Sequence, residues 1–202
     1  MDATVYLVRH GMHDWLRPGS NRLAGATGIP MNDDGRREVA RIVTMLAGRA
    51  LRWIAASPLR RTIETAELIA RGHDLEVARD ERLTEWALGP WEGMRIEEIQ
   101  KRFPDQWRTW REDPARLRLP EVEALEQVAD RMERSCLEWM EQGGEGVIVS
   151  HQDPLQALLC RLIEMPLSKM RALDIRTGSV CVARRSAHGV TVESVNAGIA
   201  LL

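Results

Sequence analysis

Histidine and arginine occur at three places in the sequence where an apolar run ends. These places are Arg9-His10-Gly11, Arg60-Arg61 and His151. A neutral histidine can attack phosphorus, and the planar arginine fork binds phosphate oxygens in pairs. Taken singly, a histidine at a strand end is more often structural than catalytic, and paired arginines usually face solvent. Three such features that converge would predict a phosphoryl-transfer site that works without a metal.

Short apolar runs predict the strands that must position these residues. Residues 5–8, 51–56 and 147–149 show no polar face, as expected of buried strands, and 75–78 is a weaker candidate. Residues 180–183 and 190–195 predict two more strands, joined by a turn at His188-Gly189. Capping residues and helical spacing predict helices that begin at Asn32 and Ser57-Pro58, cover 121–142, and begin at Pro154.

This alternation predicts an α/β fold, a three-layer αβα sandwich with a mostly parallel sheet and a C-terminal antiparallel hairpin. Ligands bind such sheets where strands end and helices begin, so the three segments should converge. We expect one domain over residues 1–202, with a cap-like insertion at about 86–121 that includes a short helix near 95–102.

The expected insertion is rich in tryptophan, with Trp86, Trp91, Trp107 and Trp110. Two interpretations stay open. The four rings either form a core cluster beneath a long loop or line a pocket, since pockets are usually apolar with a few polar groups. A tryptophan-lined pocket would hint at an apolar or ring-bearing leaving group.

Composition restricts the classes of partner. The chain has 44% hydrophobic and 29% charged residues and a formal net charge of -2, which gives no reason to expect nucleic acid or an anionic membrane. The N-terminus lacks the pattern of a signal peptide. Cys136, Cys160 and Cys181 are few and widely spaced, which favours a reducing compartment, and we expect the cytoplasm. A homodimer through the C-terminal hairpin stays open.

Ordered motifs along nearly the whole chain resemble those of the histidine phosphatase superfamily, also called phosphoglycerate mutase-like. The matching segments are Leu7-Val8-Arg9-His10-Gly11, Asn21-Arg22-Leu23, Ser57-Pro58-Leu59-Arg60-Arg61, Leu83 with Glu85, Gly89 to Gly93, and Val149-Ser150-His151. Any one motif is modestly specific, whereas the ordered set is highly specific. The resemblance implies the αβα sandwich, a phosphohistidine intermediate, no cofactor and no metal.

The resemblance also implies roles for individual residues. His10 is expected to be the nucleophile, and Arg9, Arg61 and His151 are expected to form the phosphate pocket. Glu85 is expected to protonate the leaving oxygen and later to activate water. The remaining substrate contacts that we expect come from Arg22, His13, Trp15 and Gln152. His13 has a competing interpretation, slightly favoured, as a partly exposed loop residue, and Arg60 as a solvated one.

The sequence departs from the family pattern at a few positions near the site. Met12 and His13 replace an acidic and a hydroxyl residue, Leu16 replaces an asparagine, and Gln152 and Asp153 replace two glycines. Asp153 is electrostatically unfavourable beside a phosphate unless it points away. Glu123 is expected to serve first at a helix start and, as the less favoured alternative, in the site. These departures put substrate preference and rate in question.

Four functions are compatible with these residues to different degrees. A phosphatase acting on a small phosphorylated metabolite is favoured over a phosphomutase, because the segment 85–89 lacks the basic residues of dedicated mutases. A non-catalytic binding protein is less favoured, because His10 and Glu85 are both retained. A metallohydrolase using His10, His13, Asp14 and His151 is least favoured, because Arg9 would repel a cation. The natural substrate stays open.

Overall fold

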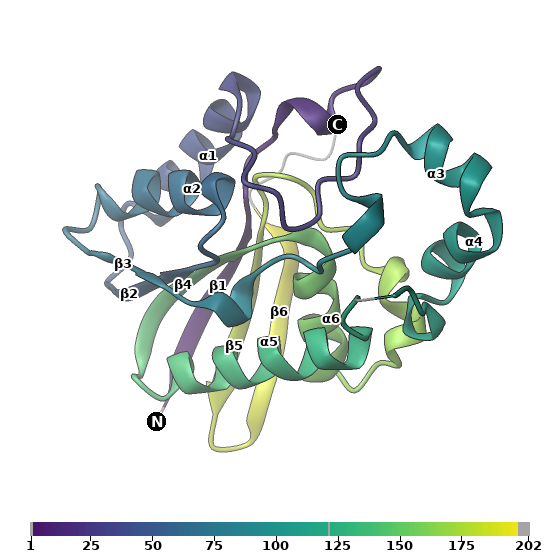
Figure 1. The fold of residues 1–202 in the computed structure, drawn as a ribbon. Coiled ribbons are helices and arrows are strands. Elements are labelled where there is room, and N and C mark those ends of the chain that lie inside the picture. The colour runs from purple at the N-terminus through teal and green to yellow at the C-terminus, as the bar shows by residue number, and fades with distance from the viewer. Residues whose placement is uncertain (1, 121, 198–202) are drawn as a thin grey trace.

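The computed structural model describes residues 2–120 and 122–197, which form a six-stranded sheet with helices on both faces (Figure 1). The strands are β1 (Ala3–Arg9), β2 (Leu51–Ala56), β3 (Val77–Arg79), β4 (Gly144–Ser150), β5 (Val180–Ser186) and β6 (Gly189–Ala197). Their order is β3-β2-β4-β1-β5-β6. Strands β1 to β4 are parallel, and β5 and β6 form the antiparallel hairpin. The predicted α/β fold is confirmed.

Two pairs of helices cover the two faces of the sheet. Helices α1 (Asp33–Leu46) and α2 (Arg60–Ala70) lie on one face, and α5 (Leu125–Met140) and α6 (Gln152–Leu162) lie on the other (Figure 1). Successive side chains of a strand point to opposite faces. Accordingly, Val5 and Leu7 join the core beneath α5 and α6, while Tyr6 and Val8 join the core beneath α1 and α2.

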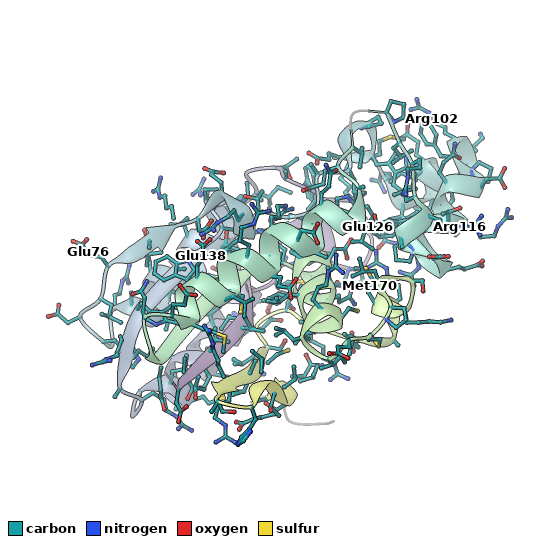
Figure 2. All side chains as sticks on the ribbon, turned by 90° about the horizontal axis from the view of Figure 1, so that it is seen from below. Glu76, Arg102, Arg116, Glu126, Glu138 and Met170 are labelled. Atoms are coloured by element: carbon teal, nitrogen blue, oxygen red, sulfur yellow. The ribbon has the colours of Figure 1, made fainter. Side chains whose placement is uncertain are left out.

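Residues 86–120 lie beyond the sheet, next to the beginning of α5. They contain η3 (Gly89–Trp91), α3 (Ile96–Arg102), α4 (Pro104–Glu112) and η4 (Pro114–Arg116). Figure 2 shows Arg102 and Arg116 in this region, at the opposite end of the molecule from Glu76. We call residues 86–120 the cap. Trp86 and Trp91 are fully buried in the same core as α5 and α6, so the cap packs on the main body through tryptophan.

Several predicted helix boundaries are wrong. Helix α2 begins at Arg60 after Leu59, because the Ser57 N–H still extends the sheet, donating to the carbonyl of Val149 at 3.0 Å. Helix α4, whose first residue is Pro104, was not predicted. Helix α5 begins at Leu125, and position 121, where its start was expected, lies outside the described residues. Helix α6 begins at Gln152, two residues before Pro154.

Shorter 3-10 turns carry the loops around the sheet. They are η1 (Asp14–Leu16), η2 (Glu81–Leu83) and η5 (Leu167–Ala172). Among the helices formed by residues 2–120 and 122–197, none is both long enough and apolar enough to cross a bilayer.

Candidate active site

The carboxyl ends of β1, β2 and β4 meet at one edge of the sheet. Arg9 pairs with Ser150 in the β1–β4 register, and the N–H of His10 continues the ladder to the Ser150 carbonyl at 3.1 Å. A cavity of about 270 Å³ opens at this edge, and its lining includes Arg9, His10, Arg61 and Glu85. The structure therefore brings together residues that are distant in the sequence, as the strand-end rule predicts. A larger hollow of about 520 Å³ lies at α2 and β3 and contains no histidine.

His10 presents one ring nitrogen to its neighbours as an acceptor. Its Nδ1 lies 2.8 Å from the carbonyl oxygen of Gly11, and its Nε2 lies 3.2 Å from the Nε–H of Arg61. A carbonyl only accepts and a guanidinium only donates, so Nδ1 carries the proton and Nε2 carries a lone pair. Burial, and then the charges of Arg61 and Arg9, lower the pKa of His10 well below its usual value. The ring is therefore neutral at physiological pH, with Nε2 available as a nucleophile.

Gly11 allows the His10 segment to lie against the start of α1. A Cβ at Gly11 would stand 2.5 Å from the carbonyl oxygen of Gly35 and 2.4 Å from the sulfur of Met31. Both distances are far below van der Waals contact, and a backbone carbonyl cannot move aside cheaply. The Gly11 N–H also donates to the Thr65 hydroxyl of α2 at 3.3 Å. The backbone after His10 is thus fixed by close contact as well as by hydrogen bonding.

Arg9 and Arg61 are buried cations without a counter-ion. Arg61 donates to the carbonyls of Thr27 at 2.7 Å and Gly25 at 2.8 Å, and Arg9 donates to the carbonyl of Ile175 at 2.6 Å. Within the described part of the chain the acceptors of both side chains are carbonyls and a ring nitrogen, not carboxylates, and the Arg9 Nε–H is buried without an acceptor. Burial lowers the pKa of Arg61 to about 10, which leaves it charged at neutral pH. Two unpaired buried cations are costly unless an anion binds between them.

His151 lies behind His10, and it is not among the described residues that line the cavity. Its ring centroid is 5.1 Å from that of His10, and its Nε2 lies 2.8 Å from the Ser57 hydroxyl. Its Nδ1 is buried without a hydrogen-bond partner. Burial and the charge of Arg61 lower its pKa well below the usual value, so this ring is also neutral.

Glu85 is the carboxyl group of the cavity whose surroundings suit a proton donor. It accepts the N–H of Trp86 at 2.9 Å and lies on the cavity wall. Burial, followed by the negative charge of Asp153, raises the pKa of Glu85 to about 8. Glu85 therefore holds its proton at neutral pH, as a general acid requires.

Arg131 of α5 holds the backbone that carries Glu85. Its guanidinium donates to the carbonyls of Arg82 and Thr84, both at 2.7 Å, and pairs with the Glu123 carboxylate at 2.8 Å. Glu123 does not cap α5, whose first flanking residue is Ala124. Its expected helix-start role is therefore wrong, and it anchors Arg131 instead. Sequence reasoning missed Arg131, because a single arginine in an amphipathic helix carries no distinguishing pattern.

The other residues expected to contact substrate are divided by the structure. Arg22, His13 and Gln152 line the cavity. Trp15 is not among the described lining residues; its ring lies 3.6 Å from where a Cβ on Gly93 would stand. His13 is 1% exposed and its ring centroid lies 5.5 Å from that of His10, so the expectation of a partly exposed loop histidine is wrong. Burial, and then the charges of Arg61 and Arg9, lower its pKa to about 3.

Asp153 does not point away from the site. It lines the cavity and is held by Arg171 of η5, with Nη1 to Oδ1 at 2.5 Å and Nη2 to Oδ2 at 3.1 Å. The positive charge of Arg171 therefore balances the negative charge of Asp153, which would be unfavourable beside a phosphate on its own. The tryptophan question is also answered by geometry: Trp110 lines the cavity, while Trp86 and Trp91 are fully buried core residues.

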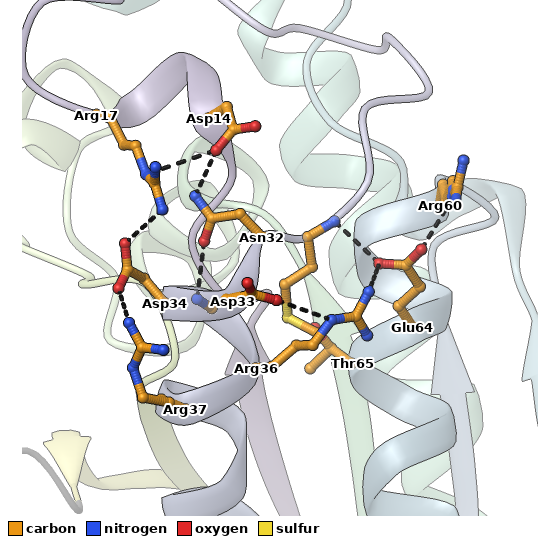
Figure 3. A network of polar contacts seen from close by, with 12 residues as sticks. Asp14, Arg17, Asn32, Asp33, Asp34, Arg36, Arg37, Arg60, Glu64 and Thr65 are labelled. Carbon is orange, nitrogen blue, oxygen red and sulfur yellow. Dashed lines mark hydrogen bonds and ion pairs between the residues drawn. The ribbon is translucent and has the colours of Figure 1, made fainter.

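A polar network fastens the outer side of the loop between His10 and α1 (Figure 3). Asn32 caps α1 by accepting the Gly35 N–H at 3.0 Å and donates to Asp14 at 2.9 Å. Glu64 of α2 accepts the Met31 N–H and the Arg60 Nε–H, both at 2.9 Å. Arg60 is thus an exposed residue paired with Glu64, and it is not among the described residues that line the cavity. Each exposed pair contributes little alone, but together they tie this loop to both helices.

Potential metal ligands are not gathered anywhere in residues 2–120 and 122–197: no three or more His, Cys, Asp or Glu side chains stand together in a suitable arrangement. Cys136, Cys160 and Cys181 are all buried free thiols.

Comparison with known proteins places the chain among phosphate-handling enzymes. The model of the histidine phosphatase superfamily (branch 1) matches residues 5–198. Phosphoserine phosphatase 1 of Hydrogenobacter thermophilus is 32% identical over 88% of this chain and 84% of that protein. Probable phosphoglycerate mutase GpmB of Serratia proteamaculans is 31% identical over 87% and 82%. The solved structure of Bacillus stearothermophilus YhfR is 26% identical, covers 98% of both chains and superposes with a TM-score of 0.91.

Proposed function

The chain belongs to the histidine phosphatase superfamily, and on that premise we propose that it is a metal-independent phosphomonoester hydrolase acting through a phosphohistidine on His10. The observation that carries the proposal is the neutral His10 ring, whose Nε2 lone pair lies beside two buried and unpaired guanidinium groups. A nucleophile next to uncompensated positive charge suits attack on a phosphate dianion. Arg9 and Arg61 take the place that a metal ion occupies in other phosphatases.

In the first step, Nε2 of His10 attacks phosphorus and the bond from phosphorus to the ester oxygen breaks. Glu85 gives its proton to the departing oxygen, so the alcohol leaves neutral. Arg61 exchanges its hydrogen bond with Nε2 for one with a phosphoryl oxygen, and Arg9 and neutral His151 stabilise the remaining charge. The proton stays on Nδ1 and is donated in a hydrogen bond to the Gly11 carbonyl, which supports the positive charge that develops on the ring.

In the second step, water attacks the phosphohistidine. Glu85, now a carboxylate, takes a proton from this water, and the bond from nitrogen to phosphorus breaks. Inorganic phosphate leaves, and both His10 and Glu85 return to their starting states. His13, Arg22 and Gln152 line the same cavity, and we assign them to the leaving portion of the substrate.

The segment 85–89 favours hydrolysis over mutase activity. A mutase must retain its bisphosphorylated intermediate while that intermediate reorients in the site, and it must exclude water from the phosphohistidine. The segment 85–89 here supplies Glu, Trp, Ala, Leu and Gly, without the basic residues that dedicated mutases carry in this segment. The three buried free thiols are those of a protein in a reducing compartment, and we propose the cytoplasm as its location.

The direct test is phosphate release from a panel of small phosphomonoesters with a chelator present. We expect turnover to be unaffected by the chelator, with stoichiometric inorganic phosphate. Loss of activity with chelator, restored by a divalent cation, would contradict the metal-independent mechanism. Isomerisation of a phosphorylated sugar acid that requires its bisphosphate, with no net phosphate release, would instead identify a mutase.

The raised pKa of Glu85 predicts a descending limb in the pH profile of kcat/KM. As pH rises through about 8, Glu85 loses the proton that the leaving oxygen needs, so kcat/KM for an alkyl phosphate should fall above that pH. The Asp153→Asn variant removes the negative charge that helps to raise this pKa, so the limb should move to lower pH. The measurement is a kcat/KM profile for both proteins. An unmoved limb in the variant would argue that another group limits the rate.

A further inference from the structure

Five arginines line the cavity, more than one phosphoryl group requires. They are Arg9, Arg22, Arg61, Arg111 and Arg171, against the carboxyl groups of Glu85 and Asp153. Arg9 and Arg61 flank His10 and serve the phosphoryl group. The lining then keeps three further arginines against the Asp153 carboxylate, since Glu85 is protonated at neutral pH. Beyond the two arginines that serve the phosphoryl group, the lining therefore carries an excess of positive charge.

Arg171 has more side-chain partners than the other two of these arginines. Its Nη1 and Nη2 grip the two oxygens of Asp153, and Nη1 also donates to the Gln156 side-chain oxygen at 2.8 Å. Its guanidinium carbon lies 4.5 Å from the centre of the Trp110 ring, so the group is stacked on the cap. Arg171 is thus held from α6 and from the cap at once, and its long side chain loses little further freedom on binding a ligand.

Among the residues that the structure describes, none accepts a hydrogen bond from one edge of this fixed guanidinium. Asp153 and Gln156 use both hydrogens of Nη1 and one of Nη2, and the Nε–H is buried without a partner. What remains is the Nε–H together with the second Nη2–H, a fork of the width that matches a carboxylate or phosphate. A buried donor without an acceptor is uncommon in proteins, and a bound ligand is one way to satisfy it.

The size of the cavity limits what such a ligand can be. About 270 Å³ is below the usual range for drug-sized ligands, roughly 300–1,000 Å³, and the phosphoryl group occupies part of it. The part of the leaving alcohol that this cavity encloses is therefore small. Among the described residues of the tryptophan cluster, Trp110 lines the cavity. Arg171 lies over its ring, which makes this wall cationic instead of apolar.

We propose that Arg171, anchored by Asp153 and stacked on Trp110, is a specificity residue that binds a second anionic group on the leaving alcohol. This inference rests on the proposed phosphatase function and narrows its substrates to small phosphomonoesters that carry a further carboxylate or phosphate. Asp153, which replaces a glycine of the family pattern, acts here as the anchor that orients the guanidinium.

A matched set of substrates tests this proposal. Phosphoglycolate and ethylene glycol monophosphate differ in having a carboxylate or a hydroxymethyl group at the same place, and ethylene glycol bisphosphate carries a phosphate there. We expect wild-type kcat/KM to favour at least one anionic substrate by roughly 10- to 100-fold, the usual value of hydrogen bonds to a charged group. Which substrate is favoured distinguishes a carboxylate from a second phosphate.

The variant Arg171→Met should reduce that ratio to near one, while Arg116→Met, an exposed arginine of the cap, should leave it unchanged. The ratio cancels general effects of the substitution on folding and on the chemical step. If Arg171→Met fails to fold, Arg171→Lys keeps the charge and loses the fork, and it should reduce the ratio in part. Equal rates for all three substrates in the wild type, or an unchanged ratio in the folded Arg171 variants, would overturn the proposal. Those results leave the phosphatase function intact, whereas no phosphate release from any substrate would remove both.

Discussion

Replacement of His10 by alanine is expected to abolish phosphate release while the protein stays folded. Among residues 2–120 and 122–197, His10 supplies the ring nitrogen that lies 3.2 Å from the Nε of Arg61 at the cavity wall, so without it neither step of the proposed reaction can begin. Loss of a catalytic nucleophile costs on the order of 10⁶-fold in turnover in well-studied enzymes. We expect a comparable loss here, measured as phosphate release from an aryl phosphate with chelator present.

The same substitution should remove the covalent intermediate. Rapid acid-free quenching of wild type with labelled substrate should trap a phosphoenzyme that is labile to acid and stable to alkali, as phosphoramidates are, and His10→Ala should trap none. His188→Ala, at the exposed turn between β5 and β6, is the matched control and should behave as wild type. A phosphoenzyme that persists in His10→Ala, or one stable to acid, would place the covalent step on another residue.

The sequence predicts the central part of this site well, because that part depends on strand ends. Buried strands are recognisable as apolar runs, and a parallel sheet brings their carboxyl ends to one edge. Arg9, His10 and Arg61 therefore meet in the structure as expected, although β1 and α2 are separated by the whole of α1. The catalytic roles of these residues are part of the proposed mechanism.

The outer part of the site depends on contacts that no sequence pattern marks. Asp153 looked unfavourable beside a phosphate, since its partner Arg171 comes from a short 3-10 turn without helical periodicity. His13 looked like an exposed loop residue, because nothing local shows that the polar network around Asn32 closes the loop over it. These features are set by packing between distant segments, which propensity and spacing do not report.

Arg61 and Arg60 give a direct comparison of a buried and an exposed arginine at adjacent positions. Arg61 is fully buried, donates to His10 and to two loop carbonyls, and has no carboxylate partner among the residues that the structure describes. Arg60 is exposed and pairs with Glu64. We expect Arg61→Met to lower kcat/KM by roughly 10²–10³-fold, the usual cost of removing one donor to a developing oxyanion. Arg60→Met should stay within about twofold of wild type, because an exposed pair contributes little.

The division of this loss between kcat and KM tests how Arg61 acts. A donor that strengthens its bond as charge develops on the phosphoryl oxygens lowers kcat when it is removed, whereas a donor that merely attracts the substrate raises KM. The exchange of the Arg61 Nε–H from His10 to a phosphoryl oxygen places most of its effect in kcat. Arg61→Lys keeps a charge without the fork and should recover only part of the rate. Full recovery by lysine would mean that the positive charge alone matters. Equal losses in the Arg60 and Arg61 variants would mean that any positive charge at the start of α2 binds the phosphate, and that the buried position of Arg61 is not required.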